Sequence, residues 1–337
     1  MLGFQPKKVA PMLTKPAIVW ALDFEDGLGL PCDDDDEIRC APGRGEFRWL
    51  HLNLADQWTR RWIEDSQGLP RPLRDLLLSS ERHQQALVEA GHVGCVLHDV
   101  ERDFDRLDAE RTGALRLVLG PRLMITARAH PLRSSDLVKN QLALGAAVRD
   151  AAGALNLAVS AIVDNIASVA REQAAQIESF EDALLVHPQT FDHRRLVAIR
   201  RRVVQFHRLL SGMRAVFKRL EKDADLPRPL LPTVEKLAQQ LGEIDNDMVL
   251  IHGELRLLRE EADLQASQRT NQNLYVLSML SALLLPATAV TGFFGMNTGG
   301  MPFARAGDGT ALALLLAVAA SLGVYAVLRM LGLVHKN

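Results

Sequence analysis

Several features that define common function classes are missing from this sequence. Its 337 residues contain only three cysteines (Cys32, Cys40 and Cys95), and none of them forms a CxxC pair. An odd count without paired spacing argues against a disulfide framework and fits a reducing compartment. The net charge of −2 gives no general positive potential, so we expect no nucleic-acid partner. No P-loop, GxSxG or HExxH motif occurs, so we expect neither nucleotide-driven pumping nor an enzyme.

Targeting signals are also missing from the N-terminus. Residues 1–16 contain lysines but no apolar run of the ~7–15 residues that a secretory signal needs. We therefore expect the charged body of the chain to stay in the cytoplasm.

Charged side chains are missing from two long segments near the C-terminus, residues 270–304 and 309–328. About 20 apolar residues cross the hydrocarbon core of a bilayer as a helix. The segments therefore predict transmembrane helices at 273–297 and 310–331. The alternative is a buried apolar hairpin in a soluble protein.

The two predicted spans form a hairpin because only a short loop, residues 298–309, joins them. Both outer ends must then lie on one side of the membrane, with residues 332–337 as a tail. Arg269, Arg329 and Lys336 flank these ends, which favours a cytoplasmic N-terminus and C-terminus.

The first span carries small and hydroxyl side chains that a plain anchor does not need. Steps of three and four place seven residues on one helix face, which we call the Leu274–Gly295 stripe. Its members are Leu274, Leu277, Ser281, Leu285, Thr288, Gly292 and Gly295. Such residues can face a water-filled path, and they can also serve close helix packing. The second span is rich in leucine and alanine, as expected of a helix that faces lipid.

The rest of the chain predicts an α+β fold. Residues 1–130 indicate a cytoplasmic α/β domain, residues 131–230 a cytoplasmic helical domain, and residues 231–272 a stalk helix. Strand patterns occur at Ala17–Phe24, Phe47–Leu54, His92–Val100, Leu115–Leu119 and Leu123–Ala129, and helical patterns at Asp56–Asp65 and Pro72–Glu89. If the stalk continues into the first span, one helix runs over 64 residues from Thr233 to Met296, about 96 Å at ~1.5 Å per residue. Such a helix requires bundling with other helices.

The first span ends in Phe294-Gly295-Met296-Asn297. A Gly-Met-Asn triplet that closes the first of two C-terminal spans, after a long helix, resembles the CorA-type superfamily of divalent-cation transporters. The next residues, Thr298-Gly299-Gly300-Met301-Pro302-Phe303, resemble the ZntB branch, which transports zinc. Magnesium-type members usually have acidic residues around the Met-Pro.

This resemblance implies a homopentamer in a bacterial inner membrane, with the first spans around a central pore and the cytoplasmic domains as a funnel. It implies that Asn297 forms a ring at the outer mouth, that Gly295 and Met296 shape the turn presenting it, and that Thr288 and Leu277 form lower rings. The partners would be the chain itself, the bilayer and divalent cations. Zinc would be the transported ion rather than a cofactor. Uptake is the expected direction, and proton coupling stays open.

The chemistry of these residues agrees with a pore. The asparagine carbonyl is a neutral acceptor that can hold the water shell of a cation without binding the ion irreversibly. Glycine permits the positive φ at which helices often end. Leu277 and Leu285 can form an apolar constriction that gates by dewetting. The alternatives are that Asn297 only caps a helix and that these leucines only pack.

Other polar clusters give weaker signals. Four stalk residues, Asp245, Asp247, His252 and Glu254, would be repeated fivefold and would attract or bind cations if they face the axis, although a solvated outer face explains each one as well. Arg194-Arg195 and Arg200–Arg202 read as solvated or paired helix faces, or as groups near anionic lipid. Two alternatives remain for the function: a magnesium, cobalt or nickel channel of the same superfamily, and a membrane-anchored scaffold.

Overall fold

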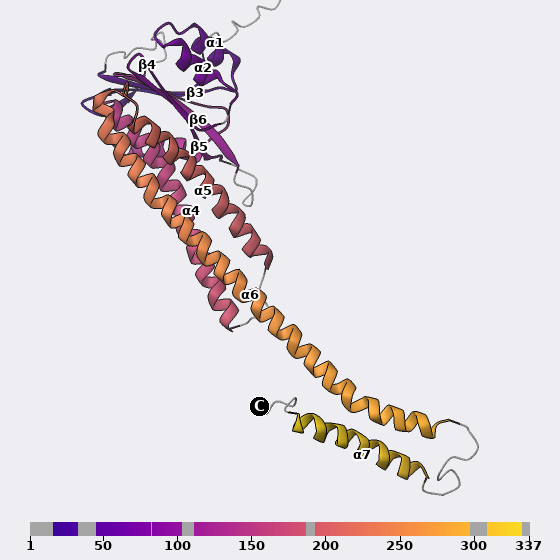
Figure 1. Ribbon diagram of the computed structural model, residues 1–337. Coiled ribbons are helices and arrows are strands. Elements are labelled where there is room, and N and C mark those ends of the chain that lie inside the picture. Colours follow the sequence, from indigo (N-terminus) through magenta and orange to yellow (C-terminus); the bar gives the residue numbers. More distant parts are fainter. Residues whose placement is uncertain are drawn as a thin grey trace, which may run out of the picture. The chain divides into compact units, whose positions relative to one another are not determined.

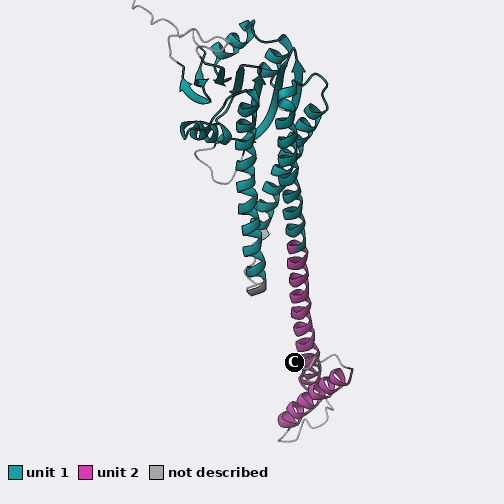
Figure 2. Ribbon diagram, turned by 90° about the vertical axis from the view of Figure 1, so that its left-hand side faces the viewer, with its two compact units in different colours: residues 1–257 teal, residues 258–337 magenta. Residues whose placement is uncertain are grey.

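The computed structural model describes residues 16–32, 45–81, 83–102, 111–186, 193–296 and 309–331. The chain divides into two compact units, which Figure 2 colours separately. Unit 1 spans residues 1–257 and contains the sheet with its helices. Unit 2 spans residues 258–337 and contains the end of the longest helix and the last helix.

One mixed sheet of seven strands forms the centre of unit 1 (Figure 1). Its strands are β1 (Ile18–Glu25), β2 (Leu28–Pro31), β3 (Phe47–Asn53), β4 (Gln85–Glu89), β5 (His92–Val100), β6 (Thr112–Leu119) and β7 (Leu123–Arg128). They lie in the order β2-β1-β3-β7-β6-β5-β4. Only β3 and β7 run parallel, and every other neighbouring pair is antiparallel.

Two short helices, α1 (Gln57–Asp65) and α2 (Arg71–Leu78), cover one face of this sheet. Asp56 begins α1 as its N-cap, because its Oδ2 accepts a hydrogen bond of 2.8 Å from the Thr59 backbone N–H. The apolar side chains of both helices and the facing strands are buried together. Members of this core include Leu50, Leu52, Ile63, Leu73, Leu77 and Ile125.

Longer helices cover the opposite face. They are α3 (Arg133–Ala143), α4 (Ala151–Val186), α5 (His193–Glu221) and, after the short 3-10 turn η2 (Arg228–Leu230), the first part of α6 (Leu231–Phe294). Fully buried apolar side chains fill the space among α4, α5 and α6, among them Ile162, Phe206, Met213, Leu241 and Met248. This layer contains the helices of residues 131–230, which the sequence predicted to be helical.

Two sequence interpretations need correction at the edges of the sheet. The pattern at Pro72–Glu89 predicted one helix, but α2 ends at Leu78 and Gln85–Glu89 forms the edge strand β4. Strand β2 was not predicted. Both edge strands belong to two-residue hairpins, with positive φ at Asp26 and Gly27 and again at Ala90 and Gly91. Such turns match the twist of paired strands, and this local geometry outweighs the helical pattern.

Unit 2 consists of the C-terminal part of α6 and of α7 (Gly309–Met330). Helix α6 is continuous over 64 residues despite Pro286, and its ends lie within two residues of the predicted Thr233–Met296. The Ser321 hydroxyl of α7 donates a hydrogen bond of 2.8 Å to the Leu283 carbonyl of α6. The α+β organisation, with a sheet-containing unit, a long helix and C-terminal apolar helices, is therefore confirmed.

A buried carboxylate joins the sheet to α3. Asp99 on β5 is fully buried, and its Oδ2 accepts hydrogen bonds from the backbone N–H and the hydroxyl of Ser134. Its other oxygen accepts from the Val100 N–H. Burial raises the pKa of Asp99 to about 6 although these hydrogen bonds favour the charged form.

This raised pKa predicts a pH-dependent stability. Because the folded state holds the Asp99 proton up to about pH 6 and the unfolded state releases it near 4, ionisation destabilises the fold as pH rises between these values. We expect wild type to lose roughly 2 kcal/mol relative to Asp99→Asn between pH 4 and 7. Urea unfolding of the full chain in detergent tests this by tryptophan fluorescence, since all four tryptophans lie within residues 20–62. The exposed Asp65→Asn is the control, and a pH-independent difference between wild type and Asp99→Asn would contradict the prediction.

Candidate cation pathway

The C-terminal part of α6 exposes apolar side chains, and their contact with water would be unfavourable. Leu277 is 59% exposed and Leu285 is 70% exposed. By length and composition three described helices, α4, α6 and α7, can cross a membrane. Half of the apolar window in α4 is buried by its own chain, whereas 0% of that in α6 and 6% of that in α7 is buried. The uncovered surfaces of α6 and α7 therefore need lipid or other chains, while α4 is largely satisfied within unit 1.

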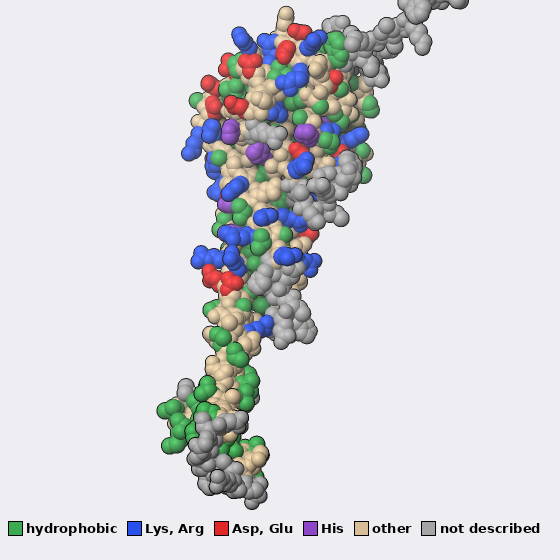
Figure 3. All heavy atoms as spheres, turned by 90° about the vertical axis from the view of Figure 1, so that its right-hand side faces the viewer, with side chains coloured by type: hydrophobic (Ala, Val, Ile, Leu, Met, Phe, Trp, Pro, Cys, Tyr) green, Lys and Arg blue, Asp and Glu red, His purple; other side chains and the backbone are tan. Residues whose placement is uncertain are grey.

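Within unit 2, the Leu274–Gly295 stripe lies on the side of α6 that faces away from α7. At about 100° per residue, the half-buried Met279, Leu283, Pro286, Val290 and Phe294 share one face. This face includes Leu283, whose carbonyl accepts the hydrogen bond from α7. All seven residues of the stripe lie on the opposite face, and all seven are exposed. Figure 3 shows this end of the chain with hydrophobic side chains and no charged ones on the visible face.

Three hydroxyl groups on this part of α6 have their protons engaged by the helix itself. The Ser281 hydroxyl donates to the Leu277 carbonyl at 2.9 Å, and the Thr288 hydroxyl donates to the Leu284 carbonyl at 2.6 Å. Thr291 donates to the Thr288 carbonyl in the same way, at 3.1 Å. Because each proton is used, the hydroxyl oxygens are left as acceptors for water. Acceptors of this kind suit the water shell of a cation, whose hydrogens point outward.

The end of α6 differs in one detail from the expectation. Helix α6 ends at Phe294, and the Gly295 N–H donates to the Thr291 carbonyl at 2.9 Å. The positive-φ glycines in the described ranges are Gly27, Gly91 and Gly145, so Gly295 does not use the left-handed conformation. A Cβ at Gly295 would lie 3.1 Å from the Thr291 oxygen, so a larger residue there would require a small local shift. Met296 is exposed, whereas Asn297, Thr298, Gly299 and Gly300 lie outside the described residues.

The four stalk residues do not form a site within one chain. Asp247, His252 and Glu254 are exposed, whereas Asp245 is buried. The described part of the chain contains no group of three or more His, Cys, Asp or Glu that could hold a metal ion.

Asp245 instead joins α6 to α5. His207 Nδ1 lies 2.9 Å from Asp245 Oδ1, and Arg214 Nη1 lies 3.3 Å from Oδ2. Sequence reasoning did not pair these residues, because more than 30 positions separate each partner from Asp245. Asp245 therefore has a structural role in joining the two helices. The exposed Asp247, His252 and Glu254 do not share it.

The sequence of this chain is similar to those of known proteins. Residues 44–330 match the family described as CorA-like Mg2+ transporter protein. A relative from Cronobacter sakazakii, named Zinc transport protein ZntB, is 26% identical over 85% of this chain and 86% of its own length. A protein of the same name from Klebsiella pneumoniae subsp. pneumoniae is 27% identical over 84% of this chain and 85% of its own length.

Two solved structures share the fold. The full-length CmaX protein has a TM-score of 0.78 at 23% identity and covers 94% of this chain and 98% of its own. The CorA magnesium transporter from Methanocaldococcus jannaschii has a TM-score of 0.74 at 17% identity, with the same coverage of 94% and 98%. At these identities the likeness concerns the fold alone.

Proposed function

We propose that this chain, which belongs to the CorA-like Mg2+ transporter family, carries zinc across a bacterial inner membrane. Membership of the family makes it a divalent-cation transporter and not an enzyme. The observation that carries this proposal is the position of the Leu274–Gly295 stripe. It is exposed, uncharged, supplied with hydroxyl acceptors and turned away from α7. A helix that lines a pore needs these properties on the face toward the axis.

The transporter assembles as a homopentamer in this proposal. One copy of α6 cannot enclose a pore, and its apolar stripe stays uncovered in a single chain. Five copies would place α6 around the axis and α7 outside, with the sheet-containing units as a funnel in the cytoplasm. The spans are residues 273–297 and 310–331, the loop 298–309 is periplasmic, and both termini are cytoplasmic. Helix α4 is not a span, because half of its apolar window is already buried.

The residues along the proposed pathway have distinct roles. The Asn297 ring at the outer mouth holds the hydrated ion, and residues 298–300 begin the loop around it. Thr288 and Ser281 accept hydrogen bonds from the ion's water further in. Leu285, Leu277 and Leu274 form apolar rings at which the pore closes by excluding water. Below the span, Asp247, His252 and Glu254 are repeated around the axis and attract cations.

Zinc is favoured over magnesium by two observations. The two curated relatives are named for zinc transport, and residues 298–303 lack acidic side chains. Magnesium, cobalt or nickel transport is the second candidate, favoured by the name of the matching family. In this proposal zinc moves into the cytoplasm.

Competitive flux through the purified full chain in lipid vesicles tests the proposal. We expect zinc entry to be saturable and to resist a tenfold excess of magnesium, because the neutral pathway has no carboxylates to favour the harder ion. Cobalt and nickel are measured in the same series. Faster magnesium than zinc flux would replace zinc with the second candidate, and the absence of any metal flux would leave the scaffold alternative.

A further inference from the structure

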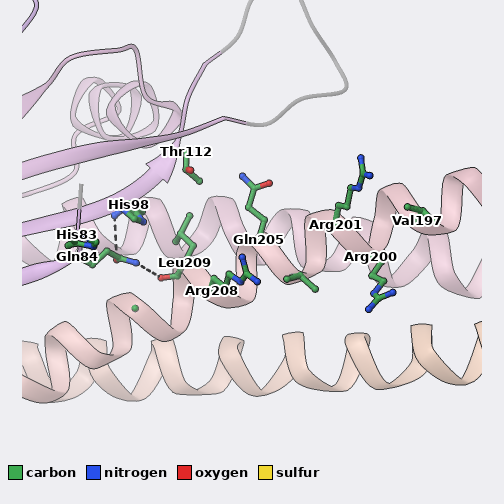
Figure 4. Close-up of a pocket in the computed structure, with 12 residues that line it drawn as sticks. His83, Gln84, His98, Thr112, Val197, Arg200, Arg201, Gln205, Arg208 and Leu209 are labelled. Carbon is green, nitrogen blue, oxygen red and sulfur yellow. Dashed lines mark hydrogen bonds between the residues drawn. The ribbon is translucent and has the colours of Figure 1, made fainter. Parts of the chain in front are cut away.

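A cavity of about 900 Å3 lies in unit 1, between α5 and the edge of the sheet formed by β4, β5 and β6 (Figure 4). It is far from the Leu274–Gly295 stripe in sequence and belongs to the other unit. Transport of a metal cation does not require it. Its lining therefore calls for a separate explanation.

The lining of this cavity is strongly basic. Arg200, Arg201 and Arg208 come from α5, and His83 and His98 come from the sheet side. The described residues that line it include no aspartate or glutamate. All three arginines are exposed, and within the described ranges none of them forms an ion pair. An anion that enters the cavity on the side of Thr112 would meet the guanidinium groups of Arg201 and Arg208 without displacing a carboxylate of the described lining.

The cavity is held open by a side chain. Gln84 lies between the sheet and α5, where its Nε2 donates 3.0 Å to the Leu209 carbonyl and its Oε1 accepts 3.4 Å from the His98 N–H. Gly212 makes room for it, because a Cβ there would lie 2.3 Å from Gln84 Nε2. These contacts fix the spacing between α5 and β5. The basic groups are therefore presented by a fixed frame.

The arrangement of the arginines suits more than one phosphate group. Arg201 and Arg208 are seven residues apart, so they lie on the same face of α5 within about 20°. In Figure 4, Arg201 and Gln205 project from α5 on the side of Thr112, while Arg200 points to the other side. A guanidinium group binds phosphate through two parallel hydrogen bonds. Val197 and Val204 add apolar surface beside these groups.

We propose that this cavity binds a nucleotide-sized molecule that carries two or more phosphate groups. The phosphates would contact Arg201 and Arg208, and the base would cover Val197 and Val204. The volume is within the 300–1,000 Å3 typical of small-molecule sites. Two other occupants share part of this chemistry: an anionic lipid headgroup, and carboxylates of a second copy of the chain.

Calorimetric titration of the full chain in detergent, in metal-free buffer, tests the proposal with adenosine triphosphate as the probe. We expect saturable binding that weakens as salt is raised. Arg201→Gln/Arg208→Gln should weaken it about tenfold or more, since two charge-assisted contacts are lost. Arg201→Lys should weaken it less, because charge is kept and only the paired geometry is lost. Arg219→Gln, an exposed arginine of α5 outside the cavity, is the matched control and should bind as wild type does.

Three comparisons distinguish the occupants. Tripolyphosphate should bind more weakly than the nucleotide because it leaves the valines uncovered, and equal affinity would overturn the nucleotide assignment. Binding of short-chain phosphatidylglycerol but not of the nucleotide would overturn it in favour of lipid. Dissociation of the oligomer in the double variant, seen by native mass spectrometry, would overturn it in favour of a second copy. Nucleotide affinity that is equal in wild type and the double variant also rejects the proposal. Since no flux is measured, the result is independent of zinc transport.

Discussion

Replacing Asn297 by alanine is expected to reduce zinc flux by about tenfold or more while unit 1 stays folded. The proposed ring loses its amide carbonyls, which accept hydrogen bonds from the water around the cation. A neutral hydrogen bond contributes about 0.5–1.5 kcal/mol, so the loss of two or more from the ring exceeds the 1.4 kcal/mol that corresponds to a factor of ten. Methyl groups cannot replace these acceptors. Initial zinc uptake into vesicles gives the flux, and tryptophan fluorescence of the same sample gives the folded state.

Asn273→Ala is the matched control, because it is the same change at the other end of the first span. Asn273 is exposed on α6 about 80° from the centre of the Leu274–Gly295 stripe. Zinc flux through the Asn273→Ala variant should stay within twofold of wild type. Wild-type flux and ion competition in Asn297→Ala would remove Asn297 from the pathway. Equal losses in both variants would assign the effect to general damage of α6.

Much of the fold was predictable because the strongest signals are local. The uncharged segments and the absence of proline between Pro232 and Pro286 predicted α6 to within two residues at each end. The edge strands β2 and β4 were missed, although Asp26-Gly27 is a strong hairpin signal. In β4 the pattern reads as helix, and pairing with β5 decides the outcome. Local propensity is a weak guide where a sheet edge offers hydrogen bonds.

The candidate sites were less predictable because they combine distant parts of the chain. Asp245 was interpreted as a metal candidate, but its contacts with His207 and Arg214 depend on how α5 packs against α6. The cavity arginines could be read only as a charged helix face, since the sheet residues opposite them lie over 80 positions earlier. The pore itself is proposed to need several chains. Periodicity in one chain predicts which face lines such a pore, but it does not predict the pore's diameter.

Attaching a positive charge at Thr288 is expected to block zinc flux almost completely. Thr288→Cys places a thiol in the middle of the Leu274–Gly295 stripe, where water reaches it if the stripe lines the pore. A methanethiosulfonate reagent carrying a trimethylammonium group would form a mixed disulfide with this thiol. The attached groups narrow the bore and repel divalent cations at short range. We expect flux to fall by about tenfold or more within the labelling time.

Reaction of the reagent with the native cysteines can be avoided. Cys32 and Cys40 can be replaced by serine, and both lie outside the proposed spans. Cys95 can remain, because it is fully buried and burial raises the pKa of its thiol to about 12, which leaves almost no reactive thiolate.

Leu283→Cys is the matched control on the opposite face of the same helix. Leu283 is half-buried, and its backbone carbonyl accepts the Ser321 hydroxyl of α7, so a thiol there should be shielded from the aqueous path. We expect the charged reagent to leave its flux unchanged when each variant is compared before and after treatment. Dithiothreitol should restore flux in labelled Thr288→Cys by releasing the attached group. If Leu283→Cys is blocked and Thr288→Cys is not, the face of α6 that touches α7 lines the path, and the proposed arrangement of the two helices is reversed.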